Sequence, residues 1–210
     1  MRKYILILLL LTSISSVISS FEKDMKYHNE PSYYYTPSYF AYACYFKLSD
    51  FNMSGYDYKI KIIGFVGYAE DGQADIYVTS KESDGLPICN PDNKWQGADY
   101  GPKKWHINNS YPNYDDCNVY DDNWHYNKDV DKFWCIYSAV VNHGPPFPMS
   151  DKESYPRIIN SFTWIVGEYN WRKGCGPGCE YCNWCMHCVI VYWGAGIENT
   201  SFGVVKALFR

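Results

Sequence analysis

Five cysteines lie within fourteen residues near the end of the chain, and thiols at such spacing can form disulfides, bind soft metal ions or exchange electrons. The five are Cys175, Cys179, Cys182, Cys185 and Cys188, in the run CGPGCEYCNWCMHC. The other four are Cys44, Cys89, Cys117 and Cys135, which makes nine in all. Because nine is odd, at least one thiol stays unpaired, links two chains as a disulfide-linked dimer, or binds something else.

Disulfides are the favoured interpretation of these cysteines. The first twenty residues resemble a secretory signal, and export leads to an oxidising compartment in which disulfides persist. Each bridge adds about 2–4 kcal/mol by restricting the unfolded chain. Close neighbours such as Cys182 and Cys185 pair only within a tight or helical turn, so we expect several cysteines of the cluster to pair with the four distant ones.

A zinc site is the second interpretation. Cys179, Cys182 and Cys185, together with His187 or Cys188, supply enough soft ligands for a tetrahedral site. However, structural zinc sites commonly separate two ligand pairs by a dozen or more residues, whereas these ligands crowd one short segment. An iron–sulfur cluster also uses CxxCxxC spacing, but oxygen-rich export disfavours it. We therefore assign no metal and no cofactor to the chain.

A thiol-redox site is the third interpretation. The run Cys175-Gly-Pro-Gly-Cys179 resembles the thioredoxin-type CGPC motif, and Trp171 lies just upstream. Gly178 lengthens the loop by one residue, and no proline follows Pro177, although the thioredoxin fold requires a downstream cis-proline and two more strands. The match is confined to five residues, so it does not carry a redox assignment by itself.

Aromatic residues between positions 95 and 134 are the candidate binding residues. They accompany many Asn and Asp side chains, and exposed rings in such surroundings can stack on sugar rings or anchor a protein partner. The opposite interpretation is that the rings fold back onto the sheet and are buried. The candidates are Trp95, Trp105, Trp124, Trp134, Tyr114 and Tyr120.

Other side chains with chemical potential do not form a recognisable motif. Six aspartates lie between residues 115 and 131 without the central Gly and terminal Glu of an EF-hand loop, which favours solvated loop charge over calcium. No Gly-x-Ser-x-Gly or His-Glu-x-x-His run accompanies the histidines. Carboxylate pairs such as Glu168 and Glu180 occur in any acidic chain. We therefore predict no catalytic residue.

The N-terminus predicts secretion. Arg2 and Lys3 precede a short apolar run and a Ser-rich stretch, with cleavage expected after Ser19 or Ser20. The apolar run is shorter than the ~20 residues that span a bilayer, so we expect no stable membrane anchor. Removal of residues 1–20 changes the net charge from −4 to −6, which disfavours nucleic acid as a partner. The sequons at Asn52, Asn108 and Asn199 predict glycosylation.

The elements that position these residues are predicted to be mostly strands. Alternation of apolar and charged residues, clearest in the run YKIKI that begins at Tyr58, is typical of a half-buried strand. Residues 70–72 resemble a turn that would make the flanking strands a hairpin. The predicted strands are 40–46, 58–68, 74–80, 134–142, 158–169, 188–193 and 203–209. Residues 83–126 are predicted to form a long surface loop, and 179–188 a short helix.

These elements predict a mostly β, disulfide-stabilised secreted domain, sandwich-like or barrel-like, with long irregular loops and at most one short helix. The expected organisation is a signal peptide over 1–20, an extended Tyr-rich lead-in over 21–39 and a Cys-rich β domain over 40–210. A weak internal similarity is compatible with two decayed repeats, about 40–130 and 131–210, and also with chance.

The chain as a whole predicts a secreted, non-catalytic binding or effector-type protein, with an unknown extracellular protein or glycan as its partner. Export, the aromatic segment and the lack of a catalytic motif point to this class. The alternative is a secreted enzyme, hydrolytic or thiol-redox, with the cysteine cluster near its site. A structural matrix protein is a third hypothesis, because the chain contains 22 tyrosines.

Overall fold

Strands dominate the protein, whose computed structural model describes residues 20–29, 31–34, 41–88, 97–109, 115–139, 147–151, 159–165, 170–175 and 181–193. Strands make up most of these residues, and the sheets that they form do not close on themselves. This confirms the mostly β prediction and favours an open, sandwich-like arrangement over a barrel. In these ranges the helical element is a 3-10 turn, η1 (Leu48–Phe51), and no helix is long and apolar enough to cross a membrane.

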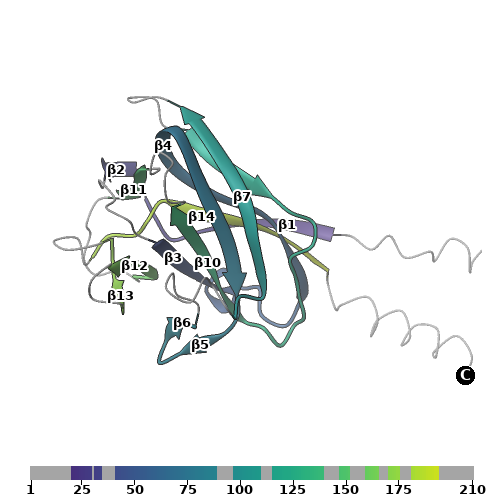
Figure 1. Cartoon of the computed structure of the whole chain (residues 1–210). Coiled ribbons are helices and arrows are strands. Elements are labelled where there is room, and N and C mark those ends of the chain that lie inside the picture. Colours follow the sequence, from purple (N-terminus) through teal and green to yellow (C-terminus); the bar gives the residue numbers. More distant parts are fainter. Residues whose placement is uncertain are drawn as a thin grey trace, which may run out of the picture.

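Antiparallel strand pairs form two layers that share one strand, β4 (Figure 1). The first layer contains β1 (Ser20–Lys26), β14 (Met186–Trp193), the first half of β4 (Asp57–Thr79), β8 (Asp115–Tyr120) and β9 (His125–Tyr126). The second contains β7 (Tyr100–Asn109), the second half of β4, β10 (Lys132–Ala139), β3 (Ala41–Lys47), β12 (Ser161–Ile165) and β13 (Asn170–Lys173). The remaining described strands are β2 (Pro31–Tyr34), β5 (Glu82–Ser83), β6 (Leu86–Pro87) and β11 (Phe147–Asp151).

Strand β4 passes from one layer into the other without a turn. Its first half pairs with β14 and β8, and its second half pairs with β10 and β7, which runs beside it in Figure 1. The predicted hairpin is therefore wrong, because the strand continues through residues 70–72. Pairing with β7 extends across that segment, and a register shift between Ala69 and Gly72 takes the place of the turn.

The main hydrophobic core lies between the two layers. Side chains alternate between the inner and outer faces of each strand, so every second residue contributes to the core. Each large apolar side chain buried there adds about 1.5–3 kcal/mol to stability. Its members on the strands include Met25, Tyr58, Ile60, Ile63, Phe65 and Ile190 from the first layer, and Tyr42, Phe46, Ile76, Val78, Phe133 and Tyr137 from the second.

A second apolar cluster lies on the outer face of the second layer. It contains Ala43 and Ile136, the sequence neighbours of inward-facing cysteines on β3 and β10, together with several aromatic residues. The aromatic members are Tyr77, Trp134, Phe162, Trp164 and Trp171. The second layer is therefore apolar on both faces, which explains why its strands carry so many aromatic residues.

Two further expectations about local structure are corrected. Residues 83–126 were expected to be loop, yet this range contains β6, β7, β8 and β9. Residues 181–188 contain a turn, an isolated bridge at Trp184 and the start of β14, so the short-helix prediction is wrong for that range. The lead-in begins with β1, which pairs with β14 from Ser20 to Lys26. Because β1 pairs with β14 along its whole length, β1 is part of the first layer.

Strands from both of the proposed repeats, 40–130 and 131–210, belong to one continuous sheet. The repeat hypothesis remains a prediction. The proposed signal peptide lies outside the described residues, except for Ser20 in β1.

Candidate functional site

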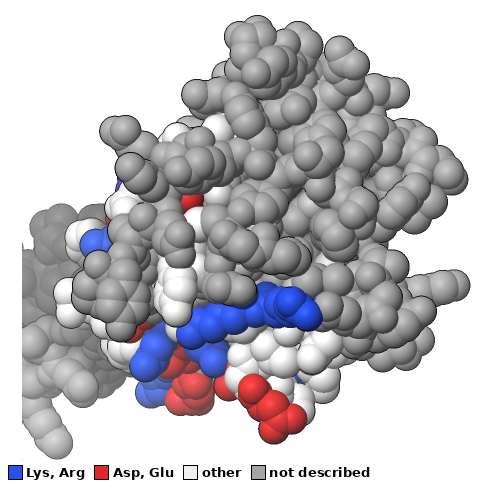
Figure 2. Space-filling model, turned by 90° about the vertical axis from the view of Figure 1, so that its left-hand side faces the viewer, with Lys and Arg blue, Asp and Glu red and all other residues white. Residues whose placement is uncertain are grey.

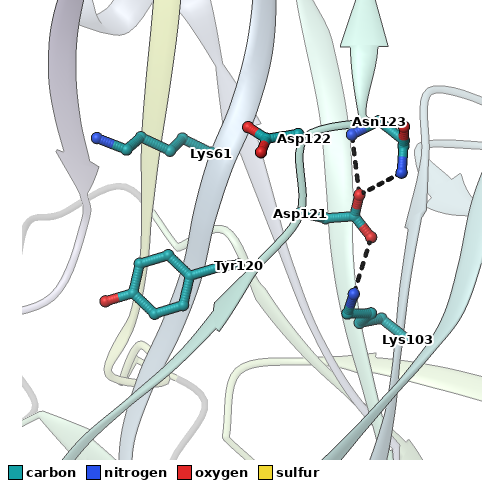
Figure 3. A pocket seen from close by; sticks show the side chains of 6 residues that line it. All are labelled: Lys61, Lys103, Tyr120, Asp121, Asp122 and Asn123. Carbon is teal, nitrogen blue, oxygen red and sulfur yellow. Dashed lines mark hydrogen bonds and ion pairs between the residues drawn. The ribbon is translucent and has the colours of Figure 1, made fainter.

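A polar hollow of about 370 Å³ opens where the first layer meets β7. Lys61 comes from β4, Lys103 from β7 and Tyr120 from the end of β8. The turn between β8 and β9 supplies Asp121, Asp122 and Asn123. Three chain segments far apart in the sequence thus meet at this hollow, whose lining side chains are drawn in Figure 3.

A β-bulge gives Lys61 its place at the hollow. On β4, Ile60 and Ile62 pair with the adjacent residues Ile190 and Val189 of β14, which leaves Lys61 as the extra residue. A bulge of this kind shifts the inward–outward alternation by one residue and re-aims the side chain at the bulge. The core positions accordingly change from Tyr58 and Ile60 to Ile63 and Phe65 further along.

Hydrogen bonds within the β8–β9 turn fix the carboxylate of Asp121. It accepts from the backbone N–H of Asn123 at 2.8 Å and from the Asn123 side-chain amide at 3.0 Å. Asp and Asn favour such turns because their side chains bond to nearby backbone groups. The next residue, Trp124, is buried in the core and its carbonyl accepts from the Ile60 N–H at 2.9 Å. The turn is therefore anchored on both sides.

Charged groups around the hollow are paired with one another. Lys103 Nζ lies 3.4 Å from Asp121, and Lys59 Nζ lies 2.8 Å from Asp122. Lys61 Nζ donates to Glu22 at 2.5 Å. Burial raises the pKa of Asp121, but the hydrogen bonds from Asn123 and Lys103 outweigh this effect, so the pKa lies below its ordinary value. Asp121 is therefore ionised at neutral pH and presents acceptor oxygens only.

Tyr120 contributes an exposed aromatic ring at the edge of the hollow. Its neighbour Val119 points into the core and is 4% exposed, whereas Tyr120 faces outward and is 59% exposed. In Figure 3 the Tyr120 and Lys61 side chains extend to the same side, while Asp121 turns toward Lys103 and Asn123. The hollow thus combines one apolar ring face with fixed polar groups, as small-ligand sites commonly do.

Of the predicted aromatic residues whose side chains are described, Tyr120 is exposed and two tryptophans are buried. Trp124 is 2% exposed and Trp134 is 0% exposed, so their rings belong to the two apolar clusters and neither is available to a ligand. The Trp134 ring makes edge contacts with Tyr45 and Phe162 at centroid distances of 5.3 and 5.1 Å. For Trp105, in β7, only the backbone is described, and Trp95 and Tyr114 lie outside the described residues.

Sequence reasoning missed the polar half of the hollow. The Asp-Asp-Asn turn after Tyr120 and the lysine alternation in β4 are visible in the sequence. However, their meeting depends on β8 pairing with β4, and residues 83–126 carried no strand signal strong enough to predict that pairing. The bulge at Lys61 likewise has no signature in the sequence.

Most described cysteines are buried. Cys44, Cys135 and Cys188 carry free thiols, and Cys175 and Cys185 are also buried. Cys182 is disulfide-bonded. No disulfide joins two cysteines whose side chains are described, so the structure does not support the predicted disulfide network. Cys89 and Cys179 lie outside the described residues, and only the backbone of Cys117 is described.

The other candidate chemistries have no assembled site in the described part of the chain. No group of three or more His, Cys, Asp or Glu side chains there is placed to hold a metal ion. His187 instead shares a hydrogen bond of 3.0 Å with Asn118. This bond crosses β4 over Gly64, where an added Cβ atom would lie 2.1 Å from the His187 ring. The histidine therefore has a structural partner and Gly64 gives it room.

One predicted glycosylation site lies at the surface. Asn52 follows η1 in an exposed turn, and the hydroxyl of Ser54, the third residue of its sequon, donates to Asp131 at 2.6 Å. Asn108 belongs to β7 with only its backbone described, and Asn199 lies outside the described residues.

The described part of the face in Figure 2 carries side chains of both charge signs. Basic and acidic side chains lie next to one another there, in its lower part. The ion pairs around the hollow have the same mixed character. Such a surface offers alternating donors and acceptors rather than a field of one sign.

Comparison with known proteins shows the fold alone. No protein-family model and no curated protein matches the chain. One similar solved structure is a variant of the clostridial cysteine protease Cwp84 after propeptide cleavage, with a TM-score of 0.59 and 12% identity over 80% of this chain and 40% of that chain. Another contains the cysteine protease and lectin-like domains of Cwp84, a surface layer associated protein of Clostridium difficile. Its TM-score is 0.53, with 12% identity over 80% of this chain and 35% of that chain.

Proposed function

We propose that the protein is an extracellular, non-catalytic binding protein of the effector type that recognises a glycan at the hollow beside Tyr120. The observation that carries this proposal is that an exposed Tyr120 ring and a fixed Asp121 carboxylate line the same hollow. A sugar ring has an apolar face that packs on an aromatic ring and hydroxyls that bond to polar groups at its edge. Asn123, Asp122 and the two lysines supply further donors and acceptors around the same hollow.

The charge arrangement favours a neutral glycan over an anionic one. Lys61 is already paired with Glu22, and Lys103 with Asp121, so neither lysine offers an uncompensated positive charge. An anionic sugar would also lie close to Asp121 and Asp122, which would repel it. Hydroxyl groups, in contrast, can donate to the carboxylates and accept from the amines.

The fold comparison makes glycans the first ligands to test. One similar structure is described as containing a lectin-like domain as well as a cysteine protease domain, and fold alone does not decide between such functions. The alternative of a secreted enzyme with the cysteine cluster near its site is less favoured. Cys175, Cys182, Cys185 and Cys188 are each at most 1% exposed, whereas reactive cysteines are usually accessible.

We further propose export, surface glycosylation at Asn52 and stabilisation by disulfides. The signal-like N-terminus, the exposed Asn52 turn and the nine cysteines support these three proposals. Neither nucleic acid nor a membrane is proposed as a partner.

A glycan array tests the proposed function. The full chain should bind a subset of neutral glycans, and Tyr120→Ala should lower those signals roughly tenfold, as expected when a central aromatic contact of about 1.4 kcal/mol is lost. Tyr181→Ala is the matched control, since Tyr181 is 46% exposed and does not line the hollow. Binding to protein partners without any glycan signal, or glycan binding that is equal in the two variants, would refute the proposal.

A further inference from the structure

Three buried thiols lie together between the two layers. Cys44 on β3 and Cys135 on β10 are direct cross-strand partners, and Cys188 belongs to β14 in the opposite layer. They are 3%, 0% and 0% exposed, respectively. All three belong to the main core, so their thiols are shielded from solvent.

The strand register places these sulfur atoms on facing surfaces. Residues directly opposite each other in an antiparallel pair point to the same face of the sheet. Their sequence neighbours Ala43, Trp134 and Ile136 belong to the outer cluster, which confirms that Cys44 and Cys135 point inward. On β14, Cys188 lies on the same inward face as Met186 and Ile190, which are also core residues.

The sulfur atoms of Cys135 and Cys188 meet across the core. These two thiols are hydrogen-bond partners of each other. Cys44 has a different partner, because its sulfur lies 3.2 Å from the hydroxyl oxygen of Ser161. That hydroxyl oxygen also accepts from the backbone N–H of Trp184 at 2.8 Å. Ser161 therefore holds the Cys44 sulfur toward β12, and the Cys135 and Cys188 sulfurs are left facing each other.

We propose that Cys135 and Cys188 form a disulfide that joins the two layers, and that Cys44 is the cysteine left over by the odd count. In this reaction each thiol loses its hydrogen and one S–S bond forms. The two electrons and two protons pass to a disulfide oxidant, such as oxidised glutathione or a protein disulfide donor, which becomes the corresponding dithiol. The bond converts a contact between layers into a covalent link.

Burial indicates when this bond forms. Desolvation raises the pKa of the Cys135 thiol, and burial does the same for Cys44. The thiolate is the reactive form, so neither group is reactive once the core has closed. Oxidation is therefore expected during folding, while the strands are still accessible to the oxidant.

A peptide map of refolded protein tests the pairing. Reduced, denatured full-length chain is refolded in a glutathione redox buffer, alkylated, and cleaved with trypsin and cyanogen bromide. These reagents isolate Cys44 in fragment 27–47, Cys135 in fragment 133–149 and Cys188 in fragment 187–206. We expect fragment 133–149 linked to 187–206, with an alkylated thiol on 27–47. A link between 133–149 and 27–47, a link from Cys135 to any other cysteine, or alkylation of both Cys135 and Cys188 would overturn the proposal.

Melting temperatures of variants provide a second measurement. The oxidised parent should melt roughly 10 °C above its reduced form through this one bond. Cys135→Ala, Cys188→Ala and the double variant should each reduce that difference by the same amount, because each removes the same bond. Cys44→Ala is the control and should keep the full difference. Unequal or additive reductions, or a reduction in the control, would contradict the assignment.

Discussion

Tyr120 and Trp124 lie four residues apart, yet one ring is exposed and the other is buried. Tyr120 ends β8 on its outer face, next to the inward Val119, whereas Trp124 follows the turn and enters the core. The position of each ring relative to the strand face, and not the local abundance of Asn and Asp, decides its exposure. Tyr120 is therefore the one predicted aromatic residue with a described side chain that can meet a ligand.

Replacement of a buried ring should affect stability and leave recognition intact. Trp134→Ala removes a ring packed against Tyr45 and Phe162, so we expect the free energy of unfolding to fall by about 3–5 kcal/mol. Urea denaturation measures this loss. The folded fraction should keep the glycan affinity of the parent. A stable Trp134→Ala protein with lost binding would instead place this ring in the binding site.

At the scale of residues, composition predicted an aromatic binding surface but could not identify its members. Tyr120 and Trp124 both have polar neighbours in the sequence, yet the position of each ring relative to the sheet makes one exposed and the other buried. The polar partners were even harder to predict from the sequence, because Lys61 and Asp121 become neighbours through pairing between distant strands. Local sequence carries little information about such non-local contacts.

At the scale of elements, the β8–β9 turn and the bulge in β4 hold the candidate site. A related anchor lies at Asp99, just before β7. Its carboxylate accepts from the N–H and hydroxyl of Ser80 at 2.5 and 2.7 Å and from the Tyr126 hydroxyl at 3.0 Å. Lys81 lies 3.0 Å away. This carboxylate therefore ties the end of β4 to β7 and β9.

Asp99 should make stability depend on acid pH. Desolvation raises the pKa of Asp99, but the bonds from Ser80, Lys81 and Tyr126 outweigh it and the pKa lies below its ordinary value of about 3.9. Its stabilising effect is therefore complete above the unfolded-state pKa and is lost as the pH falls through the lower folded-state pKa. Thermal melts from pH 7 to pH 2 should show a steeper acid loss for the parent than for Asp99→Asn. Identical profiles would contradict this role.

Gly64 in β4 should tolerate a side chain poorly. An added Cβ atom would lie 2.1 Å from His187 and 2.3 Å from Asn118, so Gly64→Ala should lower the free energy of unfolding by about 1–3 kcal/mol. Chemical denaturation measures the change. The same substitution should be nearly neutral in a chain that also carries His187→Ala and Asn118→Ala, because the obstructing groups are gone. An equal loss in both backgrounds would show that another contact is responsible.

At the scale of the whole molecule, the sequence predicted a mostly β domain but not its connections. Alternation in YKIKI was correctly assigned to a strand, whereas the Glu-Asp-Gly run was mistaken for a turn. Turn-like residues can remain in a strand when a neighbouring strand continues the pairing past them, as β7 does here. The two-layer arrangement was also difficult to predict, because an apolar residue on either face of a strand looks the same in the sequence.

Export of the chain should lead to glycosylation at its surface. If the protein passes through a eukaryotic secretory pathway, Asn52 should carry a glycan, because its sequon lies in an exposed turn after η1. Glycopeptide mass spectrometry of secreted protein should detect it, and Asn52→Gln should remove it. Secreted protein with an unmodified Asn52 would count against surface glycosylation at this turn.

The most direct test of the account is a calorimetric titration of the strongest neutral glycan from the array. Parent and Tyr181→Ala protein should bind with the same affinity, and Tyr120→Ala should bind roughly tenfold more weakly with an unchanged melting temperature. Equal affinities for all three proteins would show that the hollow beside Tyr120 is not the binding site.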